Sequence, residues 1–330
     1  MASPTSQLRT LRPELSTFEE LNGEMQSRGY VGTRILPAFG VNSPGATFGV
    51  IKLKSLLAAA GADTKRTSTG GYNRGDYEFE DRIYSTRENG WEEPIDTREL
   101  NMYSSFFDLE VIAAQRAWEH VLNSLERRII AAAVGATVTA GRTTAASGAA
   151  WTNFATSNPI TDVFAAQEAI WLRTGLWART MTVSRRSFRN LRRNAAIITA
   201  LQGQGAGVAG TQKGISIENL CEVLDLDEIV VADSIKNTAN MGQTAVLESV
   251  FPETQALVSV AAKSNDFKEP CLGRTFHWGG DGSQMGDGSM IGVVERYEEP
   301  QTRKDILRVR HETAEFILYG EAAQVITGVR

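Results

Sequence analysis

The chain has 330 residues, of which 42% are hydrophobic and 22% charged, and it is long enough to bury one large core or two smaller ones. It opens without a basic stretch followed by an apolar run, and it has no run of roughly 18 apolar residues, so we expect a soluble protein that is not secreted and has no membrane partner. A net charge of -5, from 34 basic and 39 acidic residues, argues against a protein whose main task is to grip nucleic-acid phosphates.

Residues that usually hold metals or form disulfides are few and scattered. The two cysteines, Cys221 and Cys271, lie in separate segments, so we expect free thiols in a reducing cytoplasm. The three histidines are also far apart, and His311-Glu312 with Glu315 lacks the second histidine of a zinc-protease helix. We therefore expect no metal, no cofactor and no catalytic residue.

The N-terminal 46 residues are rich in proline and short of apolar periodicity. Residues 17–28 can form a helix, but little in this stretch could bury a face alone. We expect an extended arm that packs on something else, most often a neighbouring chain.

Two strand-like runs follow the arm. Residues 47–57 are mostly apolar, residues 67–75 form a polar bend rich in glycine, and a second run alternates apolar residues at odd positions (Tyr77, Phe79, Ile83) with charged residues at even ones (Glu78, Glu80, Arg82). Alternation of this kind is typical of a half-exposed strand. The segment predicts a long hairpin that ends near residues 90–94.

The second half of this hairpin is strongly acidic. Residues 76–99 hold nine acids against three arginines, a local charge of -6. An isolated hairpin is marginal in water, so this one is either mobile or held by a partner. We expect five of its acids to contact another subunit: Glu78, Glu80, Asp81, Glu92 and Glu93.

Residues 104–134 give the strongest helical signal. Apolar residues recur there at spacings of three and four, namely Phe107, Val111, Ala114, Trp118, Val121, Leu125, Ile129 and Ala132. This spacing places them on one face, and roughly 30 residues would make a rod of about 45 Å. The charged residues, Glu126 among them, mostly fall on other faces.

The rest of the chain mixes helices and strands. We expect a loop or weak strand pair over 135–150, a helix capped by Thr161 and ending near Gly175, a short strand around Met181 and Val183, and a helix over 187–201. Later strands are predicted at 229–232, 245–247, 257–261, 306–313 and 315–327. This mixture is α+β.

Five arginines between residues 184 and 194 are candidates for contact with nucleic acid or another subunit: Arg185, Arg186, Arg189, Arg192 and Arg193. All but Arg186 could share one helical face. Arginine forks also pair with carboxylates, and the acidic hairpin offers such a surface in the same protein. We favour subunit contact; the alternative is a DNA-binding module whose affinity would fall steeply with salt.

Two glycine-rich stretches resemble ligand loops only formally. Residues 205–210 satisfy the G-x-G-x-x-G pattern but follow a basic helix instead of a strand, so a flexible loop is favoured over a nucleotide-dependent enzyme. Asp281 and Asp287 lie in the glycine-rich residues 279–292, without the spacing of an EF-hand, and predict an exposed turn. A serine-hydrolase elbow and a Walker lysine motif are also missing, so we do not expect an enzyme.

Taken in order, these segments resemble the Hong Kong 97-type fold of tailed-phage major capsid proteins, which encapsulin shells share. The resemblance covers nearly the whole chain and rests on the joint order of loose patterns of residue type. The stretches that carry it are RILP at 34–37, residues 77–100 with GWEEPID at 90–96, SLERRI at 124–129, residues 220–224 with 229–233, and residues 298–300 with 306–310.

The resemblance implies four regions. Residues 1–46 would be the N-terminal arm, 47–100 the extended β-hairpin loop, 101–155 with 293–330 the peripheral domain with its long spine helix, and 156–292 the axial domain. Copies would assemble as hexamers and pentamers into an icosahedral shell around packaged double-stranded DNA, enclosed without sequence-specific binding. An encapsulin-like compartment around a cargo protein is the alternative.

The resemblance also implies further partners. The arm starts almost at the first residue, so a separate scaffolding protein is expected, together with a portal and a decoration protein. The location would be the virion capsid, after assembly in the cytoplasm of a bacterial host. Some members cross-link a hairpin lysine to an asparagine; Lys65 and Asn237 lack matching motifs, so no such link is expected.

Overall fold

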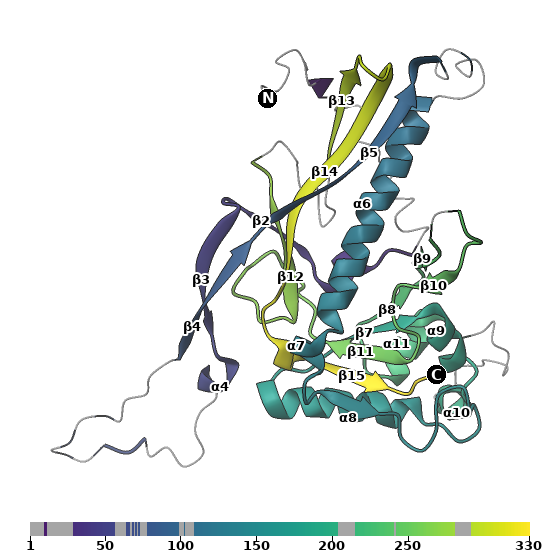
Figure 1. Ribbon diagram of the computed structural model, residues 1–330. Helices are drawn as coiled ribbons and strands as arrows, with labels where there is room; N and C mark the ends of the chain where they lie inside the picture. The colour runs from purple at the N-terminus through teal and green to yellow at the C-terminus, as the bar shows by residue number, and fades with distance from the viewer. Residues whose placement is uncertain are drawn as a thin grey trace.

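The computed structural model describes residues 10–11, 29–56, 64–66, 68, 70, 72, 78–98, 102, 109–203, 215–240, 242–280 and 292–330. Figure 1 shows a long limb, made of helix α6 and several strands, that rises from a compact domain of helices around a sheet. A two-stranded hairpin, β3 and β4, projects from the base of the limb. No helix in these residues is long and apolar enough to cross a membrane.

The limb is built on one mixed sheet. Its order is β1 (Thr10–Leu11), β13 (Val293–Glu299), β14 (Lys304–Ile317), β12 (Gly273–Trp278) and β2 (Ala38–Val41), and β5 (Arg87–Asp96) pairs with β14 as well. Only the β12 and β2 pair is parallel. The 14-residue β14 therefore joins β5 along one edge and first β13, then β12, along the other.

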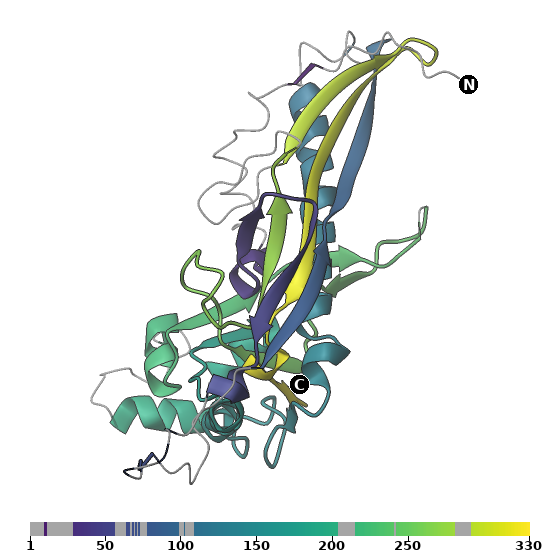
Figure 2. The ribbon, with the colours of Figure 1, turned by 90° about the vertical axis from the view of Figure 1, so that its left-hand side faces the viewer.

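Helix α6 (Leu109–Ala133) packs along this sheet, as Figure 2 also shows. Its 25 residues span about 37 Å at 1.5 Å per residue. The predicted apolar face is confirmed over the described part, because Ala114, Trp118, Val121, Leu125 and Ile129 are all buried. The predicted first turn, including Phe107, lies outside the described residues.

Glu126 corrects the expected charge pattern of this helix. It was placed off the apolar face, yet its side chain is 3% exposed. Its two carboxylate oxygens accept hydrogen bonds from the backbone N–H groups of Val31 (3.1 Å) and Gly32 (2.6 Å). Because these donors belong to a distant segment, the pattern of α6 alone could not reveal them.

The compact domain has a five-stranded sheet in the order β6 (Thr143–Ala145), β15 (Ala323–Thr327), β11 (Gln255–Ser259), β7 (Thr180–Ser184) and β8 (Glu228–Ala232). Around it lie α7 (Ala136–Thr139), α8 (Pro159–Thr174), α9 (Arg185–Leu191), α10 (Ala195–Gly203), α11 (Ile217–Val223) and the 3-10 helix η2 (Gly320–Ala322). A cluster of fully buried side chains, including Trp151, Ile170 and Met181, forms its core.

Two helix predictions in this domain need correction. Asn158, not Thr161, caps α8, because its side chain accepts from the Thr161 N–H; Gly175 then ends the helix with φ of 73°. The single helix expected over 187–201 is two helices, α9 and α10. Ser184 caps the first, and buried Asn194 accepts from the Ala196 N–H at the start of the second.

The N-terminal arm is less dependent on neighbours than expected. Helix α3 (Gly32–Ile35) and strand β2 pack on the same chain, and Val31, Ile35 and Leu36 are buried against α6 and the compact domain. In this segment the arm therefore packs on its own chain. The helix predicted over 17–28 lies outside the described residues.

The hairpin pairs β3 (Gly45–Ile51) with β4 (Phe79–Ser85), and the short α4 (Leu53–Leu56) follows β3. It ends at Ser85, not near residues 90–94, because from Arg87 onward the chain pairs with β14. Four of the acids assigned to the hairpin, Glu88, Glu92, Glu93 and Asp96, therefore belong to the limb.

Other strands differ from expectation as well. The strands predicted at 306–313 and 315–327 are not two separate strands: β14 covers the first and the start of the second, and η2 and β15 form the remainder. Strands β12 and β13 were not predicted. Residues 135–150 contain α7 and β6. The strand expected over 245–247 is part of a second small hairpin, β9 (Ile235–Asn237) with β10 (Leu247–Ser249). The glycine-rich residues 205–210 and Asp281 and Asp287 lie outside the described residues.

Candidate assembly surfaces

The β3–β4 hairpin has one face turned toward its own chain. On this inward face, Phe48 and Tyr84 join an aromatic cluster in which the Phe48 and Phe316 rings lie 5.3 Å apart and the Tyr84 and Phe276 rings 4.8 Å apart. Tyr84 is buried and donates a hydrogen bond to the Ser43 carbonyl oxygen. Packing of this kind fixes which side of the hairpin faces the protein body.

The outward face of the same hairpin is apolar and uncovered. Phe79 is 66% exposed and Ile83 is 72% exposed, and the alternation of β4 places both side chains on this one face. Their direct cross-strand partners are Ile51 and Thr47, and Gly49 lies opposite Asp81 between them. An added Cβ at Gly49 would meet nothing nearer than the Asp81 carboxylate at 3.9 Å, so this face is flat and open.

The loop-side half of the hairpin, toward the end of β3 and the start of β4, is fastened to the end of β14. Arg82 donates to the carbonyl oxygens of Ile317 (3.2 Å) and Leu318 (2.7 Å), and the Tyr319 hydroxyl donates to the Ile51 carbonyl oxygen at 3.0 Å. Burial raises the pKa of the Tyr319 hydroxyl. A cavity of about 620 Å³ lies between this end of the hairpin and residues 317–321, which follow the body of β14. These contacts therefore fix the orientation of the hairpin relative to the limb.

The acids predicted for subunit contact divide into two groups. Glu78 pairs with Lys52 (2.7 Å) and Glu80 with Arg82 (3.2 Å), and these hydrogen bonds lower the pKa of both carboxyls. Asp81 is exposed on the outward face and makes no ion pair with a described residue. These three remain on the hairpin.

The other two acids are engaged within the limb. Glu92 of β5 bonds Arg308 of β14 at 2.6 Å, and Glu93 accepts from the Trp91 indole N–H at 2.9 Å. Glu93 also lies 3.8 Å from Arg116 of α6. Sequence proximity grouped them with the hairpin, whereas strand pairing places them in the sheet.

The arginine cluster does not lie on one helical face. Arg185, Arg186 and Arg189 are exposed on α9, while Arg192 and Arg193 lie beyond its end and stand over aromatic rings, those of Phe188 (5.9 Å) and Phe154 (4.5 Å). Arg185 lies 3.7 Å from Asp233, and Arg186 lies 3.1 Å from Glu253. Arg189 makes no ion pair in the described part of the chain.

The small β9–β10 hairpin carries a second exposed apolar group that the sequence reading missed. Ile235 is 57% exposed, Val246 52% and Leu247 62%. Within the described part of the chain, its two strands pair with each other and with no other strand. The polar turn of the intervening residues 238–246 was a usable signal, because it separates two short runs that can pair.

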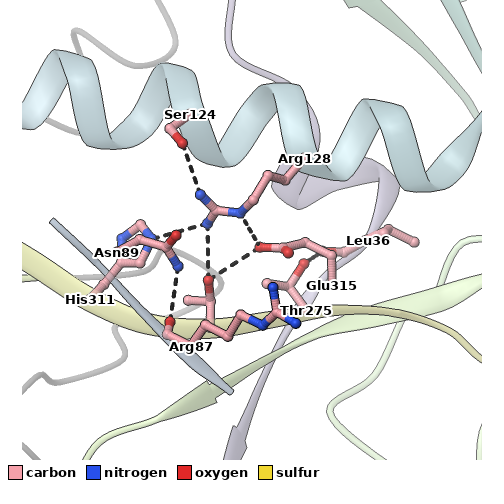
Figure 3. A network of polar contacts seen from close by, with 9 residues as sticks. Leu36, Arg87, Asn89, Ser124, Arg128, Thr275, His311 and Glu315 are labelled. Atoms are coloured by element: carbon pink, nitrogen blue, oxygen red, sulfur yellow. Dashed lines mark hydrogen bonds and ion pairs between the residues drawn. The ribbon is translucent and has the colours of Figure 1, made fainter. Parts of the chain in front are cut away.

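A buried polar cluster joins α6 to the sheet, as Figure 3 shows. The Arg128 guanidinium donates to Ser124 (2.9 Å), Thr313 (3.1 Å) and Glu315 (3.1 Å), and it lies 3.3 Å from Nε2 of His311. A guanidinium can only donate, so Nε2 of His311 accepts and carries no proton. His311 is thus part of the limb's internal packing.

Neither cysteine thiol is activated as a nucleophile. Burial raises the pKa of both thiols, Cys221 and Cys271, which makes each a weak nucleophile. Among the described residues, no three histidine, cysteine or carboxylate side chains are grouped so that they could hold a metal ion.

Neither a protein-family model nor a curated protein matches the sequence. Solved structures do. A phage-related protein from Bordetella bronchiseptica RB50 has a TM-score of 0.68 at 20% identity, with 98% of each chain covered. The capsid structure of the cyanophage P-SCSP1u has a TM-score of 0.56 at 10% identity and covers 99% of this chain and 92% of that one. A virus-like particle from Pyrococcus furiosus gives 0.51 at 12% identity, with 93% and 95% covered.

At these identities the likeness is one of fold, and it spans the whole chain. The structures include phage capsid proteins, so the Hong Kong 97-type α+β fold expected from the sequence is confirmed. It is the fold of shell-forming proteins.

Proposed function

We propose that this chain is a major capsid protein, a structural subunit without catalytic activity, whose copies assemble as hexamers and pentamers into an icosahedral shell around packaged double-stranded DNA. One observation carries the proposal. A fold shared with phage capsid structures extends over essentially the entire chain, including the projecting hairpin and the limb, and leaves no separate domain to explain.

The outward face of the hairpin gives this proposal a physical basis. Large apolar side chains such as Phe79 and Ile83 seldom stand uncovered together on a projection that has no core of its own. Burying each would be worth about 1.5–3 kcal/mol, and a shell repeats the gain at every contact. A subunit that assembles can afford such a face, whereas a monomer gains nothing from it.

Charged contacts between copies are the finer part of the proposal. Glu78, Glu80 and Asp81 on the hairpin and Arg185, Arg186 and Arg189 on α9 remain exposed and are available to a neighbour. Glu92 and Glu93 are poorer candidates because they already pair inside the limb. Arg192 and Arg193 would contribute through their stacked guanidinium planes.

The remaining partners follow from the same proposal. A shell of this type would be assembled in the cytoplasm of a bacterial host around a separate scaffolding protein, with a portal and a decoration protein in the finished virion. The DNA would be enclosed without sequence-specific contacts, which agrees with the net charge of -5.

A second candidate is an encapsulin-like compartment that encloses a cargo protein. A virus-like particle from Pyrococcus furiosus shares the fold over 93% of this chain, so the fold is not confined to phage capsid structures. Only the contents of the shell separate the two candidates.

Negative-stain electron microscopy tests the proposal directly. The protein is expressed alone and again with its neighbouring genes, and we expect closed shells or hexameric and pentameric rings. Nucleic acid inside the shells would favour the phage capsid, and protein inside would favour the compartment. A monodisperse monomer or dimer under both conditions would contradict a shell function.

A further inference from the structure

A closed ring of identical subunits needs two different surfaces on each copy. In such a head-to-tail contact, a patch on one side of a subunit meets another patch on its neighbour. The outward face of the β3–β4 hairpin is one candidate. Its complement should lie elsewhere on the molecule, expose apolar side chains and carry positive charge.

The β9–β10 hairpin meets the first two conditions. Ile235, Val246 and Leu247 are each more than half exposed, and among the strands that the structure describes these two pair just with each other. Figure 1 places β9–β10 and α9 on one side of the molecule and β3–β4 on the other. An isolated two-stranded hairpin is marginally stable, so this one would also gain from a cover.

The neighbourhood of β9–β10 also meets the third condition. Asp233 lies between β8 and β9, two residues before β9 begins, and pairs with Arg185 of α9 at 3.7 Å, which places the start of the hairpin beside the helix. Four arginines lie here against two acids, a surplus of two positive charges: Arg185, Arg186, Arg189 and Arg330 against Asp233 and Glu253. Lys236 and Glu248, on β9 and β10, pair with each other at 3.7 Å.

The β3–β4 hairpin has the opposite balance. Glu78 pairs with Lys52 and Glu80 with Arg82, so the charge left without an ion pair to a described residue is that of Asp81. Asp81 stands between Phe79 and Ile83 on the outward face. Both hairpins therefore present apolar side chains beside a charge, and the charges differ in sign.

We propose that the outward face of β3–β4 in one copy docks against the surface formed by β9–β10 and α9 in the next copy. The inference rests on the proposed shell function and names the surfaces that meet. Phe79 and Ile83 then pack on the apolar side chains of β9–β10, and Asp81 comes within reach of Arg189. Gly49 leaves the outward face flat, so the two backbones can approach closely.

Reversal of the two charges tests the pairing. Asp81→Arg and Arg189→Asp are each expected to lower the yield of shells at least about tenfold, equivalent to about 1.4 kcal/mol at the contact. The double variant Asp81→Arg with Arg189→Asp should restore assembly. A mixture of the two single variants should recover only rings with an even number of copies, because the two variants must alternate around the ring to satisfy every contact.

Wild-type protein assembled in parallel separates the two hypotheses. If the wild type, expressed alone and with its neighbouring genes, makes neither shells nor rings, the shell function fails. If the wild type assembles and the single variants also assemble normally, or if the double variant does not recover, the docking inference is overturned. Both residues are exposed and unpaired, so circular dichroism should show unchanged unfolding midpoints. Ile83→Ser gives an independent readout of the apolar half of the contact, and normal assembly of that variant would also overturn the inference.

Discussion

Strands β4 and β5 are both acidic and only Thr86 separates them, yet they differ in how far their side chains are covered by the rest of the chain. Strand β5 pairs with β14 at ten positions, and its Glu92 finds Arg308. Strand β4 pairs only with β3 in the described structure, and its Phe79 and Ile83 face outward. The strands of the limb are therefore paired and packed within one chain, whereas the hairpin is packed against its own chain on one face only.

This contrast shows that the composition of a strand does not determine whether its side chains are covered by the same chain. A period of two determines which side chains share a face, but tertiary pairing determines which face is covered. In β4 the covered face is the one with Arg82 and Tyr84, which anchor to β14 and the aromatic cluster. The more apolar face is left for something outside the subunit.

The largest expected effect on stability comes from the limb core. Leu307 of β14 is fully buried among the side chains between the sheet and α6. Leu307→Ala should lower the free energy of unfolding by about 2–5 kcal/mol, since it removes buried apolar volume and leaves a cavity. Chemical denaturation measures the loss; a change below about 0.5 kcal/mol would show that the limb core is not packed as described.

A smaller loss is expected at the junction of the arm and α6. Glu126→Gln replaces one of two acceptor oxygens with an amide that faces a backbone N–H, so we expect a cost of about 1–3 kcal/mol. Glu222→Gln, on an exposed part of α11, is the matched control and should stay within about 0.5 kcal/mol. Equal effects of the two changes would contradict the role given to Glu126.

Glu126 should also make stability depend on pH in a stated direction. Burial raises the pKa of its carboxyl above the ordinary 4.5, although hydrogen bonds from Val31, Gly32 and Ser234 oppose the rise. The folded state then holds its proton to higher pH than the unfolded state, so the contribution is fully present below the ordinary pKa and is lost as pH rises through the folded pKa. Wild type compared with Glu126→Gln should show this difference shrinking from about pH 4 upward, and growth with pH would contradict it.

The exposed ion pairs of β5 should matter little. Glu92 and Arg308 are both about one-third or more exposed, so Glu92→Gln is expected to cost about 0.2–1 kcal/mol and to cost less at high salt. Denaturation at low and high ionic strength measures this. A salt-independent loss of several kcal/mol would mean that the limb relies on this pair far more than its exposure suggests.

The smallest effect on stability should accompany the largest effect on assembly. Ile83→Ser removes an exposed side chain, so the free energy of unfolding should change by less than about 0.5 kcal/mol. Shell formation, followed by sedimentation velocity, should fall steeply. Loss of stability with normal shells would reverse the comparison between hairpin and limb.

Much of the fold could be predicted because its signals are local. The apolar spacing of α6 and the alternation of β4 are carried by the residues themselves. Other features depend on distant partners: Glu126 is buried because Val31 and Gly32 cross it, and Glu92 belongs to the limb because Arg308 pairs with it. No window of sequence contains both members of such a pair.

The candidate surfaces could likewise be predicted only where their signals are local. Asp81 and Arg189 are exposed, as a contact with another subunit would require, whereas Arg192 and Arg193 lie beyond α9 because that helix ends at Leu191. Hairpin β9–β10 was missed because its strands are only three residues long. Strands that short carry too little alternation to be recognised.

Hydrogen–deuterium exchange in free subunits and in assembled shells, separated by size-exclusion chromatography, tests the central claim most directly. Strand β5 should be protected in both states, because β14 already pairs with it. The β3–β4 hairpin should exchange faster in free subunits and become protected in shells. Equal exchange of the hairpin in both states would contradict the claim that another copy completes its outward face.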